Sequence, residues 1–381
     1  MIVLLLIIAI ALGLFYGILQ LDIPGTWKFG LVFVEMLIVS QILIKRYKLP
    51  NELGLVLLKS KKGIHLIDSL AMKEKLFNFL ADAGLVMSYG LMSIFVLRRK
   101  WSPLSLITGL LMVGLVTLFV APTAFVFLME VLKIGGTTSK VSAISDPVLG
   151  LALIGAVLLS GGLFLLVLGG VVMYGLVVLS AVVKTVFLGM DAISTTSPGG
   201  TFLLPGINLP FFEGIIAITI VMIVHEGAHA ILARIAKVPL LSSGIVIFGI
   251  IPIGAFVEPD EKKLARVEDG KQTRVLVAGS ASNLMTSTFF FLLFVALTFT
   301  INSLNLIESA YAAPVRFVYI TLGLVFALNF IVGAVNLLPL PLFDGYRIIE
   351  LNVKNKTIVT ALTYGTLFFF VLNFLPWLFH G

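Results

Sequence analysis

Long uninterrupted apolar runs recur along this chain, and they constrain its fold more than any other feature. The first run covers residues 2–21 and contains no charged residue. A helix of about 20 apolar residues spans the hydrocarbon core of a bilayer, where only helices and closed barrels satisfy their own backbone. This run has no basic n-region and no small-residue cleavage site, so we expect a retained transmembrane helix rather than a signal peptide.

The remaining runs predict an all-α polytopic membrane protein. Hydrophobic residues make up 59% of the 381 residues and charged residues only 12%, so no long polar stretch is left for a separate soluble domain. We expect about 8–10 transmembrane helices, one of which is the last span near the C-terminus. The expected spans are residues 2–21, 28–45, 76–97, 104–131, 211–235, 276–300, 315–338 and 357–378, with residues 147–188 forming two spans or one span and a re-entrant piece.

The net charge of +7 fits a membrane protein better than a nucleic-acid-binding one. The basic residues lie in short loops between apolar runs, as the positive-inside rule predicts for cytoplasmic loops. We therefore expect a multi-pass protein whose partner is the lipid bilayer, with no nucleic-acid partner. The sequence specifies no oligomeric state. Because the chain has no cysteine, disulfides and thiolate metal ligands are excluded.

Two features near the second expected span lead to local predictions. The basic connection from Lys48 to Lys75 is expected in the cytoplasm, and within it residues 53–58 and 63–67 could pair as a small hairpin. Asp82 lies in the next expected span, where an acidic residue is a functional candidate. The alternative is an interfacial ion pair with Lys73 or Lys75, about two helical turns away.

The chemistry of the chain is indicated by one short motif, His225-Glu226-Gly227-Ala228-His229. It lies inside an apolar segment that begins near Phe211. Two histidines four residues apart on a helix project from the same face, so both imidazoles can reach one zinc ion. The glutamate between them is available as a general base. This combination predicts a zinc-dependent hydrolase inside the bilayer.

A catalytic zinc takes three protein ligands, and the best candidate for the third is Asp344. It ends an irregular stretch that starts at Asn336 and contains Pro339 and Pro341. The prolines break the helix, and lipid cannot satisfy the backbone groups that they free. Such a stretch is tolerated at membrane depth where it lines a cavity or binds an ion. The alternative is that Asp344 caps a helix at the membrane surface. The expected topology places Asp344 and the histidine pair toward the same cytoplasmic side.

At these residues the sequence resembles the site-2 protease family of intramembrane metalloproteases, peptidase family M50. The resemblance covers roughly residues 204–350. It rests on the H-E-x-x-H motif, on residues 205–210 and 254–258, on Gly279–Asn283, and on Asn336, Pro339, Asp344 and Gly345.

The resemblance implies a three-helix metalloprotease core that holds Zn²⁺ through His225, His229 and Asp344. It also implies cleavage of transmembrane protein substrates, with Asn336 assisting at the oxyanion or orienting the substrate. The catalytic core is then residues 204–350, preceded by N-terminal transmembrane helices of unassigned role in residues 1–190. Residues 351–381 carry the C-terminal transmembrane helix.

The stretch 244–256 is β-branched, apolar and punctuated by glycine, so we expect short re-entrant strands rather than another span. One hypothesis is that an exposed strand edge at Val246 and Ile247 holds the extended substrate by strand addition. The alternative is that these residues only plug the cytoplasmic side of the core. Asn283, which is polar within an apolar helix, is expected to form an interhelical hydrogen bond.

Two other classes of protein would also explain the motif. A prenyl-protein endopeptidase would use H-E-x-x-H, although that class usually takes its third ligand from a glutamate. A transporter or a catalytically silent scaffold would use the site only to bind metal. A site that only binds metal has no need of Glu226, which favours the hydrolase.

Overall fold

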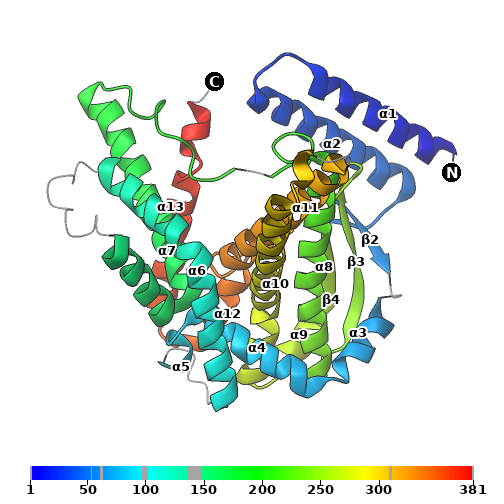
Figure 1. The fold of residues 1–381 in the computed structure, drawn as a ribbon. Coiled ribbons are helices and arrows are strands. Elements are labelled where there is room, and N and C mark those ends of the chain that lie inside the picture. Colours follow the sequence, from blue (N-terminus) through cyan, green and yellow to red (C-terminus); the bar gives the residue numbers. More distant parts are fainter. Residues whose placement is uncertain are drawn as a thin grey trace. The chain divides into compact units, whose positions relative to one another are not determined.

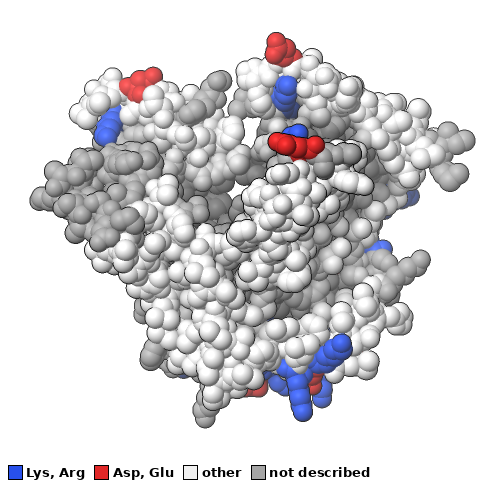
Figure 2. All heavy atoms as spheres, viewed as in Figure 1, with Lys and Arg blue, Asp and Glu red and all other residues white. Residues whose placement is uncertain are grey.

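The computed structural model describes residues 2–52, 54–60, 63–95, 102–134, 147–201, 203–308 and 311–379. Among these residues, eight helices are long and apolar enough to cross a membrane, which confirms the all-α polytopic fold (Figure 1). Lys, Arg, Asp and Glu are rare over the middle of the face shown in Figure 2. The eight helices are α1 (Ile2–Gln20), α2 (Gly25–Tyr47), α6 (Pro103–Ile134), α7 (Pro147–Leu188), α8 (Phe211–Ile235), α10 (Asp269–Ser303), α11 (Ala312–Val335) and α13 (Lys356–Leu372).

Shorter elements connect these helices. The short helices are α3 (Ile64–Ala71), α4 (Glu74–Tyr89), α5 (Met92–Phe95), α9 (Glu261–Leu264), α12 (Asp344–Asn352), and the 3-10 turns η1 (Leu306–Glu308) and η2 (Leu375–Leu378). The strands are β1 (Asn51–Glu52), β2 (Leu55–Ser60), β3 (Leu240–Phe248) and β4 (Ile251–Pro259).

The chain forms two compact units, and each is built from separate parts of the sequence. Unit 1 consists of residues 1–73, 202–266 and 289–329, and unit 2 consists of residues 74–201, 267–288 and 330–381. The N-terminal helices therefore contribute to both units. The sequence analysis divided the chain differently, into residues 1–190, 204–350 and 351–381, according to which part is expected to carry the chemistry. That division stays a prediction.

Unit 1 contains a four-stranded antiparallel sheet in the order β1-β2-β3-β4. The expected strands near residue 250 are thus present, and Figure 1 shows β3 and β4 running along α8. An added Cβ at Gly244 would come within 2.3 Å of the Leu58 carbonyl oxygen, so glycine permits the close pairing of β3 with β2.

The predicted hairpin of residues 53–58 with 63–67 is wrong. Leu55–Ser60 forms a strand, but its long-range partner is β3, and residue 53 lies outside the described residues. Ile64–Ala71 is the helix α3. Its apolar residues recur at helical spacing, and it packs against α8, where the Arg234 guanidinium donates to Asp68 at 2.5 Å.

The β3–β4 turn is fixed to α2. Gly249 adopts a positive φ of 62°, and an added Cβ there would lie 2.3 Å from the Met36 sulfur. Its N–H donates to the Ser40 hydroxyl at 2.7 Å. Met36 is fully buried in a core cluster with Phe15 of α1 and Ile251 of β4. The first two helices therefore position the strands that lie beside α8.

Unit 2 is organised around a crossing of α4 and α7 at two glycines. Gly90, with φ 54°, ends α4, and an added Cβ there would meet the backbone of Leu159 and Gly162 within 2.7 Å. Gly162, with φ 62°, interrupts α7. The helix is therefore interrupted within residues 147–188, and the expectation of two spans, or of one span and a re-entrant piece, stays a prediction.

The expected span at residues 76–97 is wrong. Its first part, α4, has 16 residues and ends at Tyr89, so it is about 24 Å long and is not one of the eight candidate spans. Residues 96–97 lie outside the described part. Asp82 does form an ion pair, but with Arg274 of α10 at 2.7 Å rather than with Lys73 or Lys75. The predicted kind of interaction was right and the predicted partner was wrong.

Candidate metal centre

The two histidines of the H-E-x-x-H motif face one another on α8. His225 is 7% exposed, and its Nε2 lies 3.2 Å from the Nε2 of His229, one helical turn further on. The ring centroids are 4.8 Å apart and the ring planes are inclined by 73°. Both Nε2 atoms are therefore directed toward one point, as the helical spacing predicted.

This separation fits two ligands of a single zinc ion. Two nitrogens, each about 2.0–2.1 Å from a tetrahedral zinc, lie about 3.3–3.4 Å apart. At the observed 3.2 Å, one ring can also donate a hydrogen bond to the other. A metal ion between the rings would take the place of that proton. The histidine pair is thus arranged for metal binding without any change of rotamer.

Glu226 is held by the neighbouring strand. The backbone N–H of Val257 in β4 donates to Glu226 Oε2 at 3.1 Å. This contact fixes one carboxylate oxygen and leaves Oε1 able to accept a proton from water. The spacing of the motif predicts the role of Glu226. The hydrogen bond from β4 was not predicted, because the pairing that places β4 beside α8 is non-local.

Gly227 provides space beside the motif. An added Cβ at this position would meet no atom of the described residues within 4 Å, so no packing contact requires glycine there. Glycine in a helix interior lowers stability relative to alanine by roughly 0.5–1 kcal/mol. Gly227 is two residues from each histidine, so this open space lies on the face of α8 opposite the imidazoles.

Asp344 lies in unit 2 at the first position of α12. The preceding irregular stretch folds back on itself, because the Gly345 N–H donates to the Asn336 carbonyl oxygen at 2.8 Å. An added Cβ at Gly345 would lie only 1.9 Å from the Leu337 carbonyl oxygen. Leu337 and Leu338 are fully buried, so this loop is packed firmly in place.

Asn336 is thus close to Asp344 along this folded loop, as the motif predicted. Its proposed role toward an oxyanion stays a prediction. Asn283 of α10 is fully buried, and an added Cβ at Gly333 would lie 3.1 Å from the Asn283 Cβ. The helices pack closely there, and the expected interhelical hydrogen bond of Asn283 stays a prediction.

Tyr89 is a residue near the candidate site that the sequence did not point to. It is the last residue of α4, it is 1% exposed, and its ring packs on Phe164 at a centroid distance of 5.2 Å. Asp344 is near enough to act on it electrostatically. An aromatic residue in an apolar helix looks like ordinary core, so nothing in its local sequence marks this position.

Val246 and Ile247 do not form a free strand edge. Both lie in β3, which pairs with β2 on one side and with β4 on the other. Val246 faces Leu57 and Gly254, and its strand is central in the sheet. The prediction that these two residues offer an exposed edge is therefore wrong. Along the described sheet, the long strand with one unpaired edge is β4.

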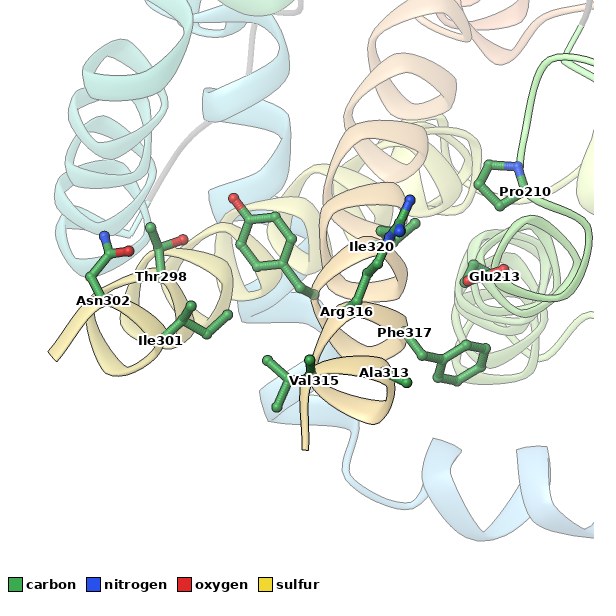
Figure 3. A pocket seen from close by; sticks show the side chains of 12 residues that line it. Pro210, Glu213, Thr298, Ile301, Asn302, Ala313, Val315, Arg316, Phe317 and Ile320 are labelled. Carbon is green, nitrogen blue, oxygen red and sulfur yellow. The ribbon is translucent and has the colours of Figure 1, made fainter. Parts of the chain in front are cut away.

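A cleft of about 940 Å³ lies at the far end of α8 (Figure 3). Glu213 of α8, Thr298 of α10 and Arg316 of α11 are among its lining residues. Glu213 precedes His225 by 12 residues, or about 18 Å along the helix axis. The cleft is therefore separate from the histidine pair.

His225, His229 and Asp344 together offer a donor set that could hold a metal ion. Neutral imidazole nitrogen and carboxylate oxygen are ligands that zinc takes in catalytic sites, where a fourth position remains for water. The chemistry of this donor set fits zinc.

Comparisons with known proteins agree with this assignment. Residues 213–375 match the family model Peptidase_M50, described as Peptidase family M50. A stretch of 58 residues is 47% identical to "Uncharacterized protein MJ0971" from Methanocaldococcus jannaschii, and it covers 15% of this chain and 16% of that protein. No solved structure matches the chain. Residues 213–375 are thus similar to peptidase family M50, a family of membrane zinc metalloproteases.

Proposed function

We propose that this protein is an intramembrane zinc metalloprotease that hydrolyses peptide bonds within or near the transmembrane segments of membrane proteins. The observation that carries the proposal is the pair of His Nε2 atoms 3.2 Å apart on a membrane-spanning helix. This helix lies within the stretch that matches peptidase family M50, and a glutamate adjoins the first histidine.

The proposed zinc ligands are His225, His229 and Asp344. A zinc ion bound by them would lower the pKa of a water molecule and polarise the scissile carbonyl. Two histidines and one carboxylate leave the fourth position for that water. The third ligand is supported by the donor chemistry of Asp344 and by its place in a firmly packed loop.

Glu226 is the proposed general base. Its Oε2 accepts the Val257 N–H, which holds the carboxylate in one orientation, and Oε1 takes the proton from the attacking water. The same carboxyl group then gives the proton to the leaving amine. Asn336 is proposed to donate a hydrogen bond to the developing oxyanion, a contribution of about 3 kcal/mol in other hydrolases.

We further propose that the substrate backbone pairs with the edge of β4 that faces away from β3. A helical substrate hides its peptide bonds in its own hydrogen bonds, so it must be extended before cleavage. The N–H of Val257 points to Glu226 and therefore away from β3, and the N–H of Ala255, two residues earlier, faces the same edge. This edge replaces the predicted one at Val246 and Ile247, and it adjoins the general base.

The active site is proposed to face the cytoplasm. The motif lies near the end of α8 that carries Arg234 and is followed by Lys237. The next connection, between β4 and α10, carries Lys262, Lys263 and Arg266. Basic loops of this kind stay on the cytoplasmic side of the membrane.

The decisive experiment measures zinc content and cleavage on the same preparations. The purified chain in liposomes is expected to hold about one zinc ion per molecule. It is also expected to cleave co-reconstituted membrane proteins that have a single transmembrane helix with helix-breaking residues in it. Glu226→Gln is expected to keep the zinc and lose cleavage, whereas His225→Ala is expected to lose both. Wild-type protein that stays free of metal after zinc is supplied would contradict the proposal.

Strand pairing has its own test. Ala255→Pro removes one N–H from the edge of β4 that faces away from β3 and leaves the hydrogen bonds between β4 and β3 in place. Cleavage is expected to fall while zinc content is unchanged. A variant with normal zinc content and normal cleavage would exclude substrate pairing at this edge.

A further inference from the structure

A buried carboxyl group lies in the middle of the second membrane helix, far from the charged loops. Glu35 is 10 residues from the start of α2 and 12 from its end, which corresponds to about 15 Å and 18 Å along the axis. Its side chain is 8% exposed. A charge at this depth costs several kcal/mol unless it is compensated, so acids there are rare and functional.

Glu35 lines a groove of about 370 Å³ between α1 and α2. Every other residue that lines the groove is apolar, and several of them are about half exposed, among them Ile10 and Leu14 of α1 and Ile38 of α2. The groove is therefore open toward the surroundings of the helix pair. Its volume is far larger than the roughly 30 Å³ of one water molecule, and it can take a whole side chain.

No described side chain donates a hydrogen bond to Glu35. The backbone of Phe15 in α1 does interact with the carboxylate, but the Phe15 amide lies in the interior of a helix, where it also serves the helix's own bonding. The described part of the fold thus buries an acid in an apolar groove without supplying a basic side chain to pair with it.

We propose that the α1–α2 groove binds a transmembrane helix of another membrane protein, and that this helix carries a Lys or Arg near its middle that pairs with Glu35. Charge complementarity supports this occupant. A basic side chain brings the charged partner that the buried carboxylate lacks among the described residues, and the carboxylate compensates a charge that lipid would not. The exposed apolar side chains of the groove then pack against the rest of that helix.

Two other occupants fit the groove less well. A lipid chain would fill it but would leave the carboxyl without a basic partner, since lipid headgroups lie at the membrane surface and Glu35 is about 15 Å from one end of α2 and about 18 Å from the other. A second copy of this chain offers no basic residue at the required depth in its described spans. In the eight candidate spans, every Lys and Arg lies within five residues of a span end.

The test uses synthetic transmembrane peptides of Leu and Ala with one central Lys, in phosphatidylcholine vesicles that contain the full chain. Because the chain has no cysteine, Tyr47→Cys gives a single donor-dye site at the end of α2, and the peptide carries the acceptor. Energy transfer is measured against the peptide-to-lipid ratio. The Lys peptide is expected to bind about tenfold more tightly than the same peptide with Leu in place of Lys.

Variants identify the carboxyl group responsible. Glu35→Gln and Glu35→Leu are expected to abolish the difference between the two peptides, and Glu35→Lys is expected to transfer the preference to a peptide with a central Glu. Glu213→Gln, which changes an acid near the start of α8, is the matched control and is expected to keep the wild-type preference.

Equal binding of the Lys and Leu peptides to the Tyr47→Cys chain that keeps Glu35 would overturn the proposal, and that comparison requires no substitution in the groove. A preference for Lys that survives in both Glu35→Gln and Glu35→Leu would overturn it equally.

Discussion

Replacing Gly345 by alanine perturbs the candidate metal centre through the backbone, without touching any proposed ligand. Gly345 follows Asp344, and an added Cβ would lie 1.9 Å from the Leu337 carbonyl oxygen and 2.2 Å from its carbonyl carbon. It would also lie 2.7 Å from the Leu338 carbonyl oxygen. All three neighbours are backbone atoms, so no side-chain rotation relieves the contact.

The size of the displacement follows from these distances. Cβ atoms essentially never approach other heavy atoms within 3.0 Å, so the start of α12 must move by about 1 Å relative to Leu337. The hydrogen bond from the Gly345 N–H to Asn336, now 2.8 Å, resists that movement. We expect a loss of about 1–3 kcal/mol in the free energy of unfolding, as for other overpacked sites.

The same displacement weakens metal binding. Ligand distances in zinc sites hold within about 0.2 Å, so a shift of about 1 Å at Asp344 removes most of its contribution. We expect zinc affinity to fall about 10- to 100-fold, the range seen when the support of a metal ligand is disturbed. Zinc affinity is measured by competition with a chelator, and stability by thermal unfolding in detergent.

Gly227→Ala is the matched control, because it makes the same change on α8 in open space. It is expected to keep stability or raise it by roughly 0.5–1 kcal/mol. If Gly345→Ala unfolds at the wild-type temperature and binds zinc as tightly as Gly227→Ala, the reasoning from backbone contact is refuted.

Two further predictions concern ion pairs outside the metal centre. Asp82→Asn leaves Arg274 without its bidentate partner in a largely buried position, so unfolding in detergent is expected to become easier by about 2 kcal/mol; an unchanged melting temperature would rule this out. In β4, hydrogen bonds from Ser242 and Lys59 hold the pKa of Glu258 below its ordinary value of 4.5. This lowered pKa gives stability that is present above pH 4.5 and is lost as the pH falls through the folded-state pKa. Glu258→Gln is expected to flatten the pH dependence of unfolding below pH 4.5, and an unchanged profile would contradict the assignment.

The sequence predicted those parts of the fold and site that depend on local spacing. The convergence of His225 and His229 follows from one helical turn, and the long spans follow from hydropathy over about 20 residues. The fold of the Asn336–Gly345 stretch was also signalled locally, because its prolines and glycine exclude a continuing helix.

The errors all involve partners that are distant along the chain. Asp82 pairs with a residue 192 positions away, and β2 pairs with a strand more than 180 positions away. The end of α4 at Gly90 depends on the break in α7 at Gly162. No local pattern encodes such contacts, and each of them overrides a reasonable local prediction. Val246 and Ile247 were assigned to a free edge for the same reason, since β2 covers that edge from a distant segment.

The pairing of β2 with β3 also determines how this protein can be dissected. A fragment limited to residues 204–350 would keep β3 and β4 but lose β2, and with it every hydrogen bond along one side of β3. The bared edge is long and rich in apolar residues, and such edges template aggregation. Residues 55–60 thus cover this edge of β3, and any shortened version of the chain that keeps residues 204–350 has to retain them.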